Sequence, residues 1–508
     1  MTIPAILELE QAIETFKGKI QILLSVEEVS DWDGKRLQER EQEIRQTGLE
    51  LAGQCIALLL TSLSQAPLAQ QESNKRTESS RGFGSYSQGK KEVRVKTLGN
   101  VEMSLSIDYV LKRRSGNVAG GKKKSVKPGQ RGKESGQGFY PFLRWLGMEE
   151  GVTPMVWTTV ASFGMMSSSF AVACKQLQEW GIKLSEQRIE RLTYCFGRAG
   201  VQLTEQWMAQ LEQGQLPVGE TLRGQRVGLN VDGGRTRLRR NKKGKPKANG
   251  RRGYYGDWRE PKLFTVYALD EEGHRIDSLE LPITNDGTFG DVERFMALLE
   301  MYLVKLGVVH ASQVLLVADG APWIWQRIPA LLQRLGLCAE QIVELIDFYH
   351  AAENLWKFAE VIFCKTKQAK EWFEKARSTM KYKSFSALVK EMQKLVDALS
   401  SNKKKTEAEA KLSYFSGQPQ RFNYSQVKAM NLPIGSGAIE SLIRQVVNLR
   451  LKGNGKFWLP EHAEIILHGR CQWAAAQWDH FCQRILTSGI TPKLPPTLTF
   501  YLTTPEAA

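Results

Sequence analysis

The run Val314-Leu315-Leu316-Val317-Ala318-Asp319-Gly320-Ala321, followed by Pro322, combines an apolar segment with one carboxylate. Five apolar residues, most of them branched, lead directly to Asp319. A short continuous apolar run of this kind is typical of a strand that is buried on both faces of a parallel or mixed sheet. Open α/β sheets bind ligands beyond the carboxyl ends of their strands. The run therefore predicts that Asp319 lies at a ligand-binding edge.

Asp319 by itself has two interpretations. Burial of an unpaired charge is costly, so a metal ion beside the carboxylate would explain its position. Alternatively, the side chain caps the helix that follows the Gly-Ala-Pro turn. The other acids of the chain are needed to choose between these interpretations.

The sequence around this run predicts an α/β domain that begins near residue 221. Three strands, a helix, a strand, a helix, a strand and a long helix follow one another up to residue 364. The strands are expected at 226–232, 262–269, 275–284, 314–318 and 342–346. This is the element order of a ribonuclease-H-like fold. Residues 365–430, which are helical and charged, form an expected helical insertion, and 431–486 supply the last helices of the domain.

Two further acids occupy comparable places. Asp232 ends the first strand, and Glu440 lies on a helix that Ser436 is placed to cap. In a ribonuclease-H-like sheet the first and fourth strands are neighbours, so Asp232 and Asp319 would meet. Clustered carboxylates repel each other unless cations lie between them, and two Mg²⁺ ions about 4 Å apart suit phosphodiester chemistry. The alternative for Glu440 is a surface ion pair with Arg444.

Composition favours a polyanionic partner. The formal net charge is +16, which suits nucleic acid. No apolar run is expected to cross a membrane, and the N-terminus has no secretion signal. The seven cysteines are scattered without any C-x-x-C pair, so we expect reduced cytosolic thiols and no zinc site.

The N-terminal part of the chain is expected to be mostly α-helical and to bind DNA. The pattern predicts helices in 1–68, a polar linker in 69–90, and short strands with a basic loop in 91–135. Residues 136–220 are helical, and within them the segment 170–192 fits a helix-turn-helix. A structural helical hairpin fits equally well. A Pro-rich tail, 487–508, ends the chain.

Two acid-free basic runs, at 112–133 and 235–252, are candidates for phosphate contacts. The alternative is that they are solvated loops. The candidate DNA-binding side chains are Arg235, Arg237, Arg239, Arg240, Lys242, Lys243, Arg444, Arg450 and Lys452.

Several motifs, spread over about 140–485, resemble those of a known family. They are 230–234 (Asn-Val-Asp-Gly-Gly), 318–325 (Ala-Asp-Gly-Ala-Pro-Trp-Ile-Trp), 347–350 (Asp-Phe-Tyr-His) and 435–440 (Gly-Ser-Gly-Ala-Ile-Glu). Together they resemble DDE transposases of bacterial insertion sequences, closest to the ISKra-four family within the mutator-like group. A basic segment, 450–453, continues the likeness.

The resemblance implies a function and a site. Asp232, Asp319 and Glu440 would be the catalytic acids and would bind two Mg²⁺ ions, which Mn²⁺ can replace. Asp347 and His350 match an accessory Asp-x-x-His motif, although His350 also fits a histidine satisfied at a helix start. The partners would be double-stranded DNA at terminal inverted repeats and at the target, with the protein a homodimer or larger oligomer in the bacterial cytoplasm, at the nucleoid.

Two other functions fit the same residues. One is a transposase-derived DNA-binding protein without catalysis. The presence of acids at all three motif positions argues against it. The other is a ribonuclease-H-like, structure-specific nuclease that does not transfer strands. The sequence also departs from the family, because relatives often carry paired cysteines in the region equivalent to 109–145 and this chain has none there.

Overall fold

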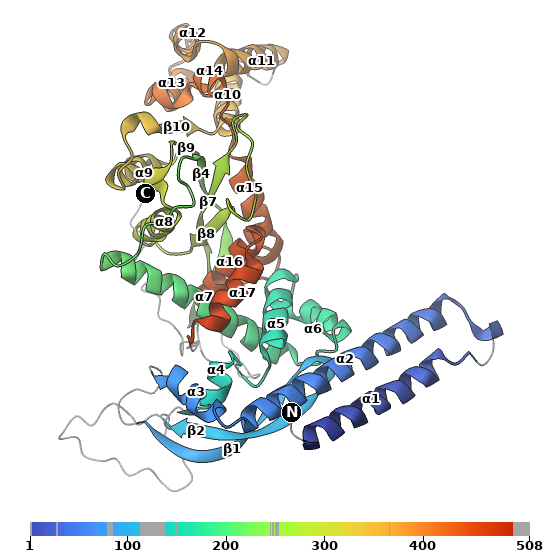
Figure 1. The fold of residues 1–508 in the computed structure, drawn as a ribbon. Helices are drawn as coiled ribbons and strands as arrows, with labels where there is room; N and C mark the ends of the chain where they lie inside the picture. The colour runs from blue at the N-terminus through green and yellow to red at the C-terminus, as the bar shows by residue number, and fades with distance from the viewer. Residues whose placement is uncertain are drawn as a thin grey trace. The chain divides into compact units, whose positions relative to one another are not determined.

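The computed structural model describes residues 3–26, 29–78, 85–111, 138–148, 150–243, 245, 248, 253–364 and 366–490 (Figure 1). The chain forms two compact units. One comprises Met1–Gly200 together with a segment that begins at His480, and the other comprises Val201–Asp479. The basic run 112–133 and the Pro-rich tail from 491 onward lie outside the described residues.

The first unit is mostly helical and contains one small sheet. Its helices are α1 (Ile3–Leu24), α2 (Gly34–Gln65), α3 (Ala69–Arg76), α4 (Pro141–Trp145), α5 (Pro154–Met166), α6 (Phe170–Glu179), the first part of α7 (Glu186–Glu212) and α17 (Trp478–Thr487). Short 3-10 turns lie at Val29–Asp31 and Leu98–Asn100. The sheet has the order β1 (Tyr86–Lys96), β2 (Glu102–Leu111), β3 (Gly138–Phe139), with both pairs antiparallel.

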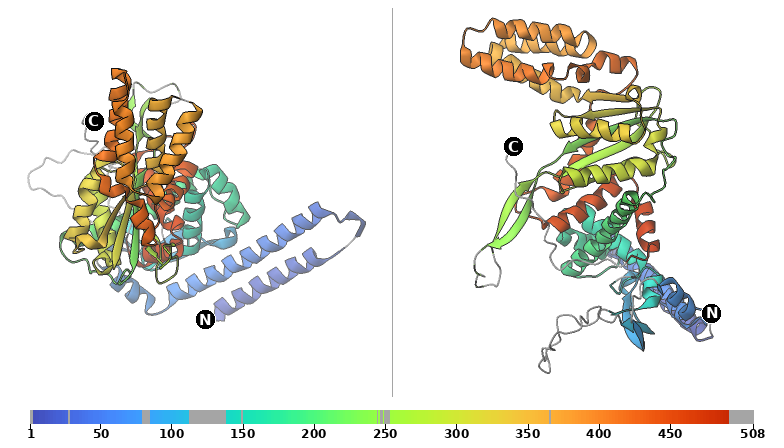
Figure 2. Two further views of the ribbon diagram at one scale, coloured as in Figure 1. Left: turned by 90° about the horizontal axis from the view of Figure 1, so that it is seen from above. Right: turned by 90° about the vertical axis from the view of Figure 1, so that its left-hand side faces the viewer.

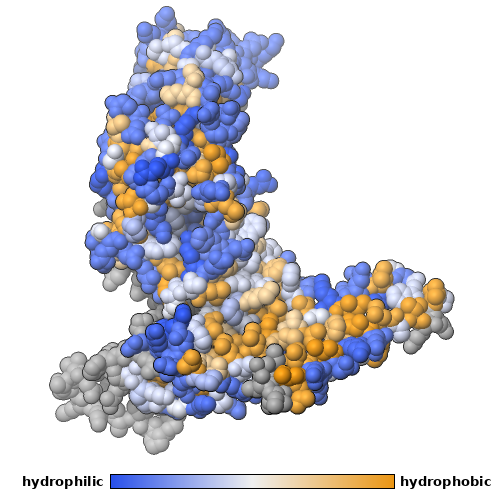
Figure 3. All heavy atoms as spheres, viewed as in Figure 1, coloured by the Kyte–Doolittle hydropathy of each residue, from blue (hydrophilic) through white to orange (hydrophobic). Residues whose placement is uncertain are grey.

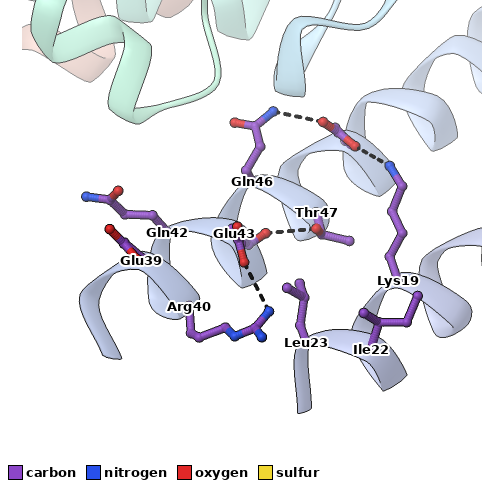
Figure 4. Close-up of a pocket in the computed structure, with 10 residues that line it drawn as sticks. Lys19, Ile22, Leu23, Glu39, Arg40, Gln42, Glu43, Gln46 and Thr47 are labelled. Atoms are coloured by element: carbon purple, nitrogen blue, oxygen red, sulfur yellow. Dashed lines mark hydrogen bonds and ion pairs between the residues drawn. The ribbon is translucent and has the colours of Figure 1, made fainter. Parts of the chain in front are cut away.

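α1 and α2 pack side by side as a helical hairpin, with a groove of about 660 Å³ between them (Figure 4). Lys19 pairs with Glu50 across the groove at 2.9 Å, and Arg40 pairs with Glu43 at 3.3 Å. The first ion pair joins α1 to α2, and the second lies within α2.

The sequence predicted no segment that could cross a membrane, and α2 is an exception to that prediction by length and composition. Within the described residues, it is the one helix long and apolar enough to cross a membrane, judged by length and composition alone. Figure 3 shows hydrophobic residues along the α1–α2 pair, where Leu7, Ile22 and Leu59 are more than half exposed.

Two predicted boundaries in this unit are wrong. The expected linker, 69–90, contains helix α3 and the start of β1, because Ala69 and Ser73 are buried and hold α3 in the core. The last helix, expected in the α/β domain, groups with the first unit, where Phe481 of α17 packs edge-on against Phe196 at 5.8 Å. Ala476, with φ of +54°, separates α17 from the helix before it.

The segment 170–192 folds as two helices joined by a short turn. The Ser169 hydroxyl caps α6, and the Ser185 hydroxyl accepts the Arg188 N–H at the start of α7. Gly181 turns the chain with a φ of +65°. Near the start of α7, Arg188 and Arg191 pair with Glu150. The use of this helical pair for DNA recognition stays a prediction.

The second unit is built on a five-stranded sheet of order β10-β9-β4-β7-β8. These strands are β4 (Arg226–Gly233), β7 (Lys262–Leu269), β8 (Thr284–Thr288), β9 (Gln313–Ala318) and β10 (Ile342–Ile346). β7 is antiparallel to both neighbours, whereas β9 is parallel to both β4 and β10. A separate antiparallel hairpin consists of β5 (Thr236–Lys243) and β6 (Gly253–Arg259).

Helices cover both faces of this sheet (Figure 1). They are the end of α7, α8 (Val292–Leu306), α9 (Pro322–Arg334), α10 (Phe348–Phe363), α15 (Gly437–Ile443) and α16 (Pro460–Ala474), with 3-10 turns at Val308–His310 and Ala339–Gln341. The central strands are buried on both faces. Even the polar Asn230 is fully buried in β4, where its side chain accepts the Tyr267 hydroxyl at 2.7 Å.

One strand and one helix of this unit differ from their predictions. The third strand is Thr284–Thr288, not 275–284, because the chain before it bends through an exposed segment in which Leu279 is 95% exposed. The helix that carries Glu440 ends at Ile443 and continues as a π-helix, Arg444–Leu451. Its wider turn breaks the helical spacing of Glu440, Arg444 and Asn448, although all three side chains are exposed.

The helical insertion gathers beyond the carboxyl ends of β9 and β10 (Figures 1 and 2). It comprises α11 (Lys367–Tyr382), α12 (Phe385–Asp397), α13 (Asn402–Ser416), a 3-10 turn at Pro419–Phe422 and α14 (Tyr424–Ala429). Phe385 stacks on Phe422 with ring centroids 4.6 Å apart, and Phe415 packs on both rings. This aromatic core is continuous with the core of the sheet.

Candidate active site

Asp232 and Asp319 stand at the ends of two neighbouring parallel strands. Val231 of β4 lies opposite Ala318 of β9, and each acid is the next residue along its chain. Asp232 Oδ1 accepts the Gly233 N–H at 2.6 Å, and Asp319 Oδ1 accepts the Ala321 N–H at 3.0 Å. Both side chains are partly buried. The pairing register therefore places the two carboxylates at one edge of the sheet.

The Asp319 side chain only partly matches its alternative interpretation as a helix cap. The residue at the cap position of α9 is Ala321, whose side chain makes no capping bond. Asp319 instead holds the turn before the helix, and its backbone carbonyl accepts the Trp325 indole N–H at 2.8 Å.

The electrostatics of Asp232 favour a cation at this edge. Burial raises the pKa of Asp232 to about 6, and the negative charges of Asp319 and Glu260 act in the same direction. The Gly233 N–H and His350 oppose this rise. A raised carboxyl pKa means that the environment disfavours the ionised form, and a bound cation would remove that penalty.

Asp347 connects the end of β10 to the segment that precedes Glu440. It is fully buried, and its Oδ1 accepts the His350 N–H at 2.8 Å while its Oδ2 accepts the Ser436 N–H at 2.5 Å. The Phe348 N–H adds a bond to the Ile434 carbonyl at 3.0 Å. Two chain segments nearly ninety residues apart in sequence are thereby held side by side.

Glu440 lies with Asp347 and His350. One ligand atom from each of the three residues falls within 4.8 Å of the others, and their exposure increases from buried Asp347 through His350 to exposed Glu440. The Ser436 hydroxyl also contacts Glu440 Oε1 at 3.4 Å. In the part of the chain that the structure describes, Glu440 and Arg444 form no ion pair, contrary to the surface-pair alternative.

The five candidate residues thus form two groups that His350 connects. Asp232 and Asp319 interact at the strand ends, and Glu440 clusters with Asp347 and His350. His350 belongs to the second group and also acts electrostatically on Asp232. Among the described residues, Asp232, Asp319 and Glu440 do not all have ligand atoms within 4.8 Å of one another, and their convergence on one ion site stays a prediction.

Two neighbours of these acids were missed in the sequence. Glu260 lies beside Gly233, where a Cβ on that glycine would fall 2.3 Å from Glu260 Oε1. Glu260 lies two residues before Lys262, which pairs with Gly233 in the antiparallel strands. Its place at the start of the second strand could have indicated this proximity. Tyr414 of α13 packs on Gly320, and burial raises its pKa, with Asp319 and Asp347 adding to the effect. Nothing in its local sequence indicated this contact.

The candidate DNA-binding residues differ in exposure. Arg235, Arg237, Arg239, Arg444 and Lys452 are exposed. The side chains of Arg240, Lys242 and Lys243 lie outside the described residues. The prediction that Arg450 binds DNA is not supported by its position. Arg450 is only 3% exposed, and its guanidinium lies 5.1 Å from the centre of the Trp458 ring. As it stands in this structure, it cannot contact a phosphate from solvent.

The donor set fits a divalent cation. Carboxylate oxygens are the ligands that Mg²⁺ and Mn²⁺ prefer. Comparisons of this chain with models of protein families, with curated proteins and with solved structures find no match.

Proposed function

We propose that this protein is a DNA transposase of the DDE class with a ribonuclease-H-like catalytic domain. It binds the ends of its insertion sequence, cleaves DNA strands in the presence of Mg²⁺, and joins the 3′-hydroxyl ends to target DNA. The observation that carries the proposal is the juxtaposition of Asp232 and Asp319 at the ends of paired strands. The adjacency of the first and fourth strands of the sheet supports the fold assignment.

The residues have separate roles in this proposal. Asp232, Asp319 and Glu440 would hold Mg²⁺, or Mn²⁺ in its place. When bound, the metal supplies activation of the attacking oxygen and stabilisation of the leaving oxygen. Asp347 orients the segment that carries Glu440 through its two hydrogen bonds. His350, which clusters with Glu440, would contact the same cation or the DNA strand beside it.

Charge supports double-stranded DNA as the partner. The chain carries a net charge of +16, and the exposed Arg235, Arg237 and Arg239 follow Asp232 within a few residues. Cationic side chains beside the proposed cleavage site would hold the phosphate backbone and release counterions. The proposal includes a homo-oligomer on DNA, in the bacterial cytoplasm at the nucleoid.

A strand-transfer assay tests the function. The purified chain is incubated with Mg²⁺, a DNA fragment that ends in the sequence flanking its gene, and a supercoiled target plasmid. We expect fragment ends joined to the plasmid through their 3′-hydroxyls. Cleaved but unjoined ends would instead favour a nuclease. A gel shift without any cleavage would indicate a DNA-binding protein, and either result would overturn the proposal.

A further inference from the structure

The β5–β6 hairpin extends away from the five-stranded sheet (Figure 2, right). Its base is anchored to the segment after the π-helix. The Arg239 N–H donates to the Trp458 carbonyl at 2.7 Å, and the Trp458 N–H donates to the Arg237 carbonyl at 3.2 Å. Leu238 and Thr236 are buried on the inner face of β5. The hairpin is therefore anchored through β5, and the alternate residues Arg237 and Arg239 lie on the other, exposed face of that strand.

Aromatic rings and arginines alternate along that outer face. The Arg237 guanidinium lies 4.7 Å from the centre of the Trp258 ring and 5.6 Å from that of Phe457. Phe457 packs edge-on against Tyr254, with centroids 5.3 Å apart, and the Arg239 guanidinium lies 4.8 Å from the Tyr254 ring. Trp258, Arg237, Phe457, Tyr254 and Arg239 form a continuous row, which we call the aromatic–arginine row.

A glycine makes this row possible. Gly256 lies between Tyr254 and Trp258 on the same face of β6, and a Cβ there would fall 3.0 Å from Phe457 Cε1. The missing side chain lets the Phe457 ring lie against the strand. The row thus combines residues of both hairpin strands with Phe457 from a distant segment of the chain.

The row remains open to solvent. Trp258 is 48% exposed and Tyr254 is 40% exposed. Cation–π contacts at exposed sites contribute only about 0.5–1 kcal/mol each, so stabilisation of the hairpin is a weak reason to expose large rings. Exposed rings beside arginines are the arrangement that stacks on nucleic acid bases. The ten basic residues between Arg235 and Arg252, without an acid, would attract the phosphates.

We propose that the aromatic–arginine row binds unpaired DNA bases by stacking. The bases of a duplex present their flat faces only to one another, whereas an unpaired strand exposes them. This inference rests on the proposed function, because cleavage of the two DNA strands at different positions would leave unpaired nucleotides for the hairpin that follows Asp232 to bind. It adds a substrate class that charge alone does not specify.

Fluorescence anisotropy with labelled oligodeoxythymidylate of about 12 nucleotides tests the row. EDTA is present, so that binding is measured without cleavage. Trp258→Ala should weaken binding by about tenfold or more, because stacking contributes about 1–3 kcal/mol per base. Trp258→Phe should retain most of the affinity. Binding to a duplex of equal length should change little in both variants.

Tyr255→Ala is the matched control. Tyr255 is 51% exposed and lies on the opposite face of β6 from Trp258. It should leave the affinity for the unpaired strand unchanged. Equal losses for Trp258→Ala and Tyr255→Ala, or no loss with Trp258→Ala while circular dichroism shows a folded protein, would overturn the inference. Failure of the proposed function appears separately, as absent Mg²⁺-dependent cleavage in the unsubstituted chain.

Discussion

At the scale of single residues, Asp347 is a fully buried carboxylate that joins two segments of the candidate site. Its two oxygens accept backbone N–H groups from His350 and Ser436, on two different segments. The same geometry keeps Glu440 next to His350. Its role in this structure is to position the residues around it.

Asp347→Asn should destabilise the protein and disturb the site. An amide has only one acceptor oxygen, so one buried N–H would lose its partner at a cost of about 1–3 kcal/mol. We expect a lower free energy of unfolding, measured by urea denaturation, and slower cleavage with unchanged DNA affinity. Asp291→Asn, at the exposed cap of α8, is the control and should be nearly neutral. Equal effects of the two substitutions would contradict the positioning role.

The buried His462 should make the stability of the protein depend on pH. Burial lowers its pKa to about 4, and the charge of Arg239 acts in the same direction. The unfolded chain then binds a proton more readily than the folded chain between about pH 6.5 and 4. The contribution of neutral His462 to the free energy of unfolding is complete above pH 6.5. It is lost as the pH falls through 4, and the loss is at most about 3 kcal/mol.

His462→Gln should therefore reduce the loss of stability over this acidic range, as measured by urea unfolding at several pH values. His274→Gln is the matched control, because the His274 side chain is 79% exposed. If both variants follow the same pH profile as the unsubstituted chain, burial of a neutral His462 does not contribute.

At the scale of elements, the turn after β9 is in contact with the helical insertion. A Cβ on Gly320 would fall 2.8 Å from Tyr414 Cε2, so the glycine leaves room for the ring of α13. The same ring lies near enough to Asp319 and Asp347 for both to act on its pKa. The insertion thus packs directly beside two of the candidate acids.

A double-mutant cycle tests this contact. Gly320→Ala should destabilise the chain by about 1–3 kcal/mol, because the ring must move out of a packed position. With Tyr414→Ala already present, the same change should cost clearly less, since the clash is gone. Gly437→Ala, where a Cβ would meet nothing within 4 Å, should be nearly neutral. Strictly additive effects of Gly320→Ala and Tyr414→Ala would contradict the packing described here.

Local patterns predicted some elements and failed on others for physical reasons. β9 and β10 followed from short runs rich in branched apolar residues, which favour a strand. The π-helix after Ile443 was missed because its apolar residues also fit an ordinary helix. The grouping of Glu440 with Asp347 and His350 depends on hydrogen bonds between distant segments, which periodicity does not report.

At the scale of the whole molecule, the proposed chemistry and the proposed affinity for DNA are assigned to different residues. Asp232 and Asp319 lie at strand ends and Glu440 lies on α15, whereas exposed arginines lie on the hairpin that follows β4. Removing one carboxylate charge should therefore affect cleavage but leave the basic surfaces intact. This separation is the central claim of the proposed function.

Asp319→Asn measures that separation most directly. The amide oxygen can still accept the Ala321 N–H, and the loss of charge relieves repulsion with Asp232, so the fold should persist. On one preparation, gel-shift binding to the ends of the element and Mg²⁺-dependent cleavage of the same DNA are measured together. We predict unchanged binding and cleavage slower by about 10²–10³. Cleavage as fast as that of the unsubstituted chain would show that Asp319 only holds its turn, and would contradict the account.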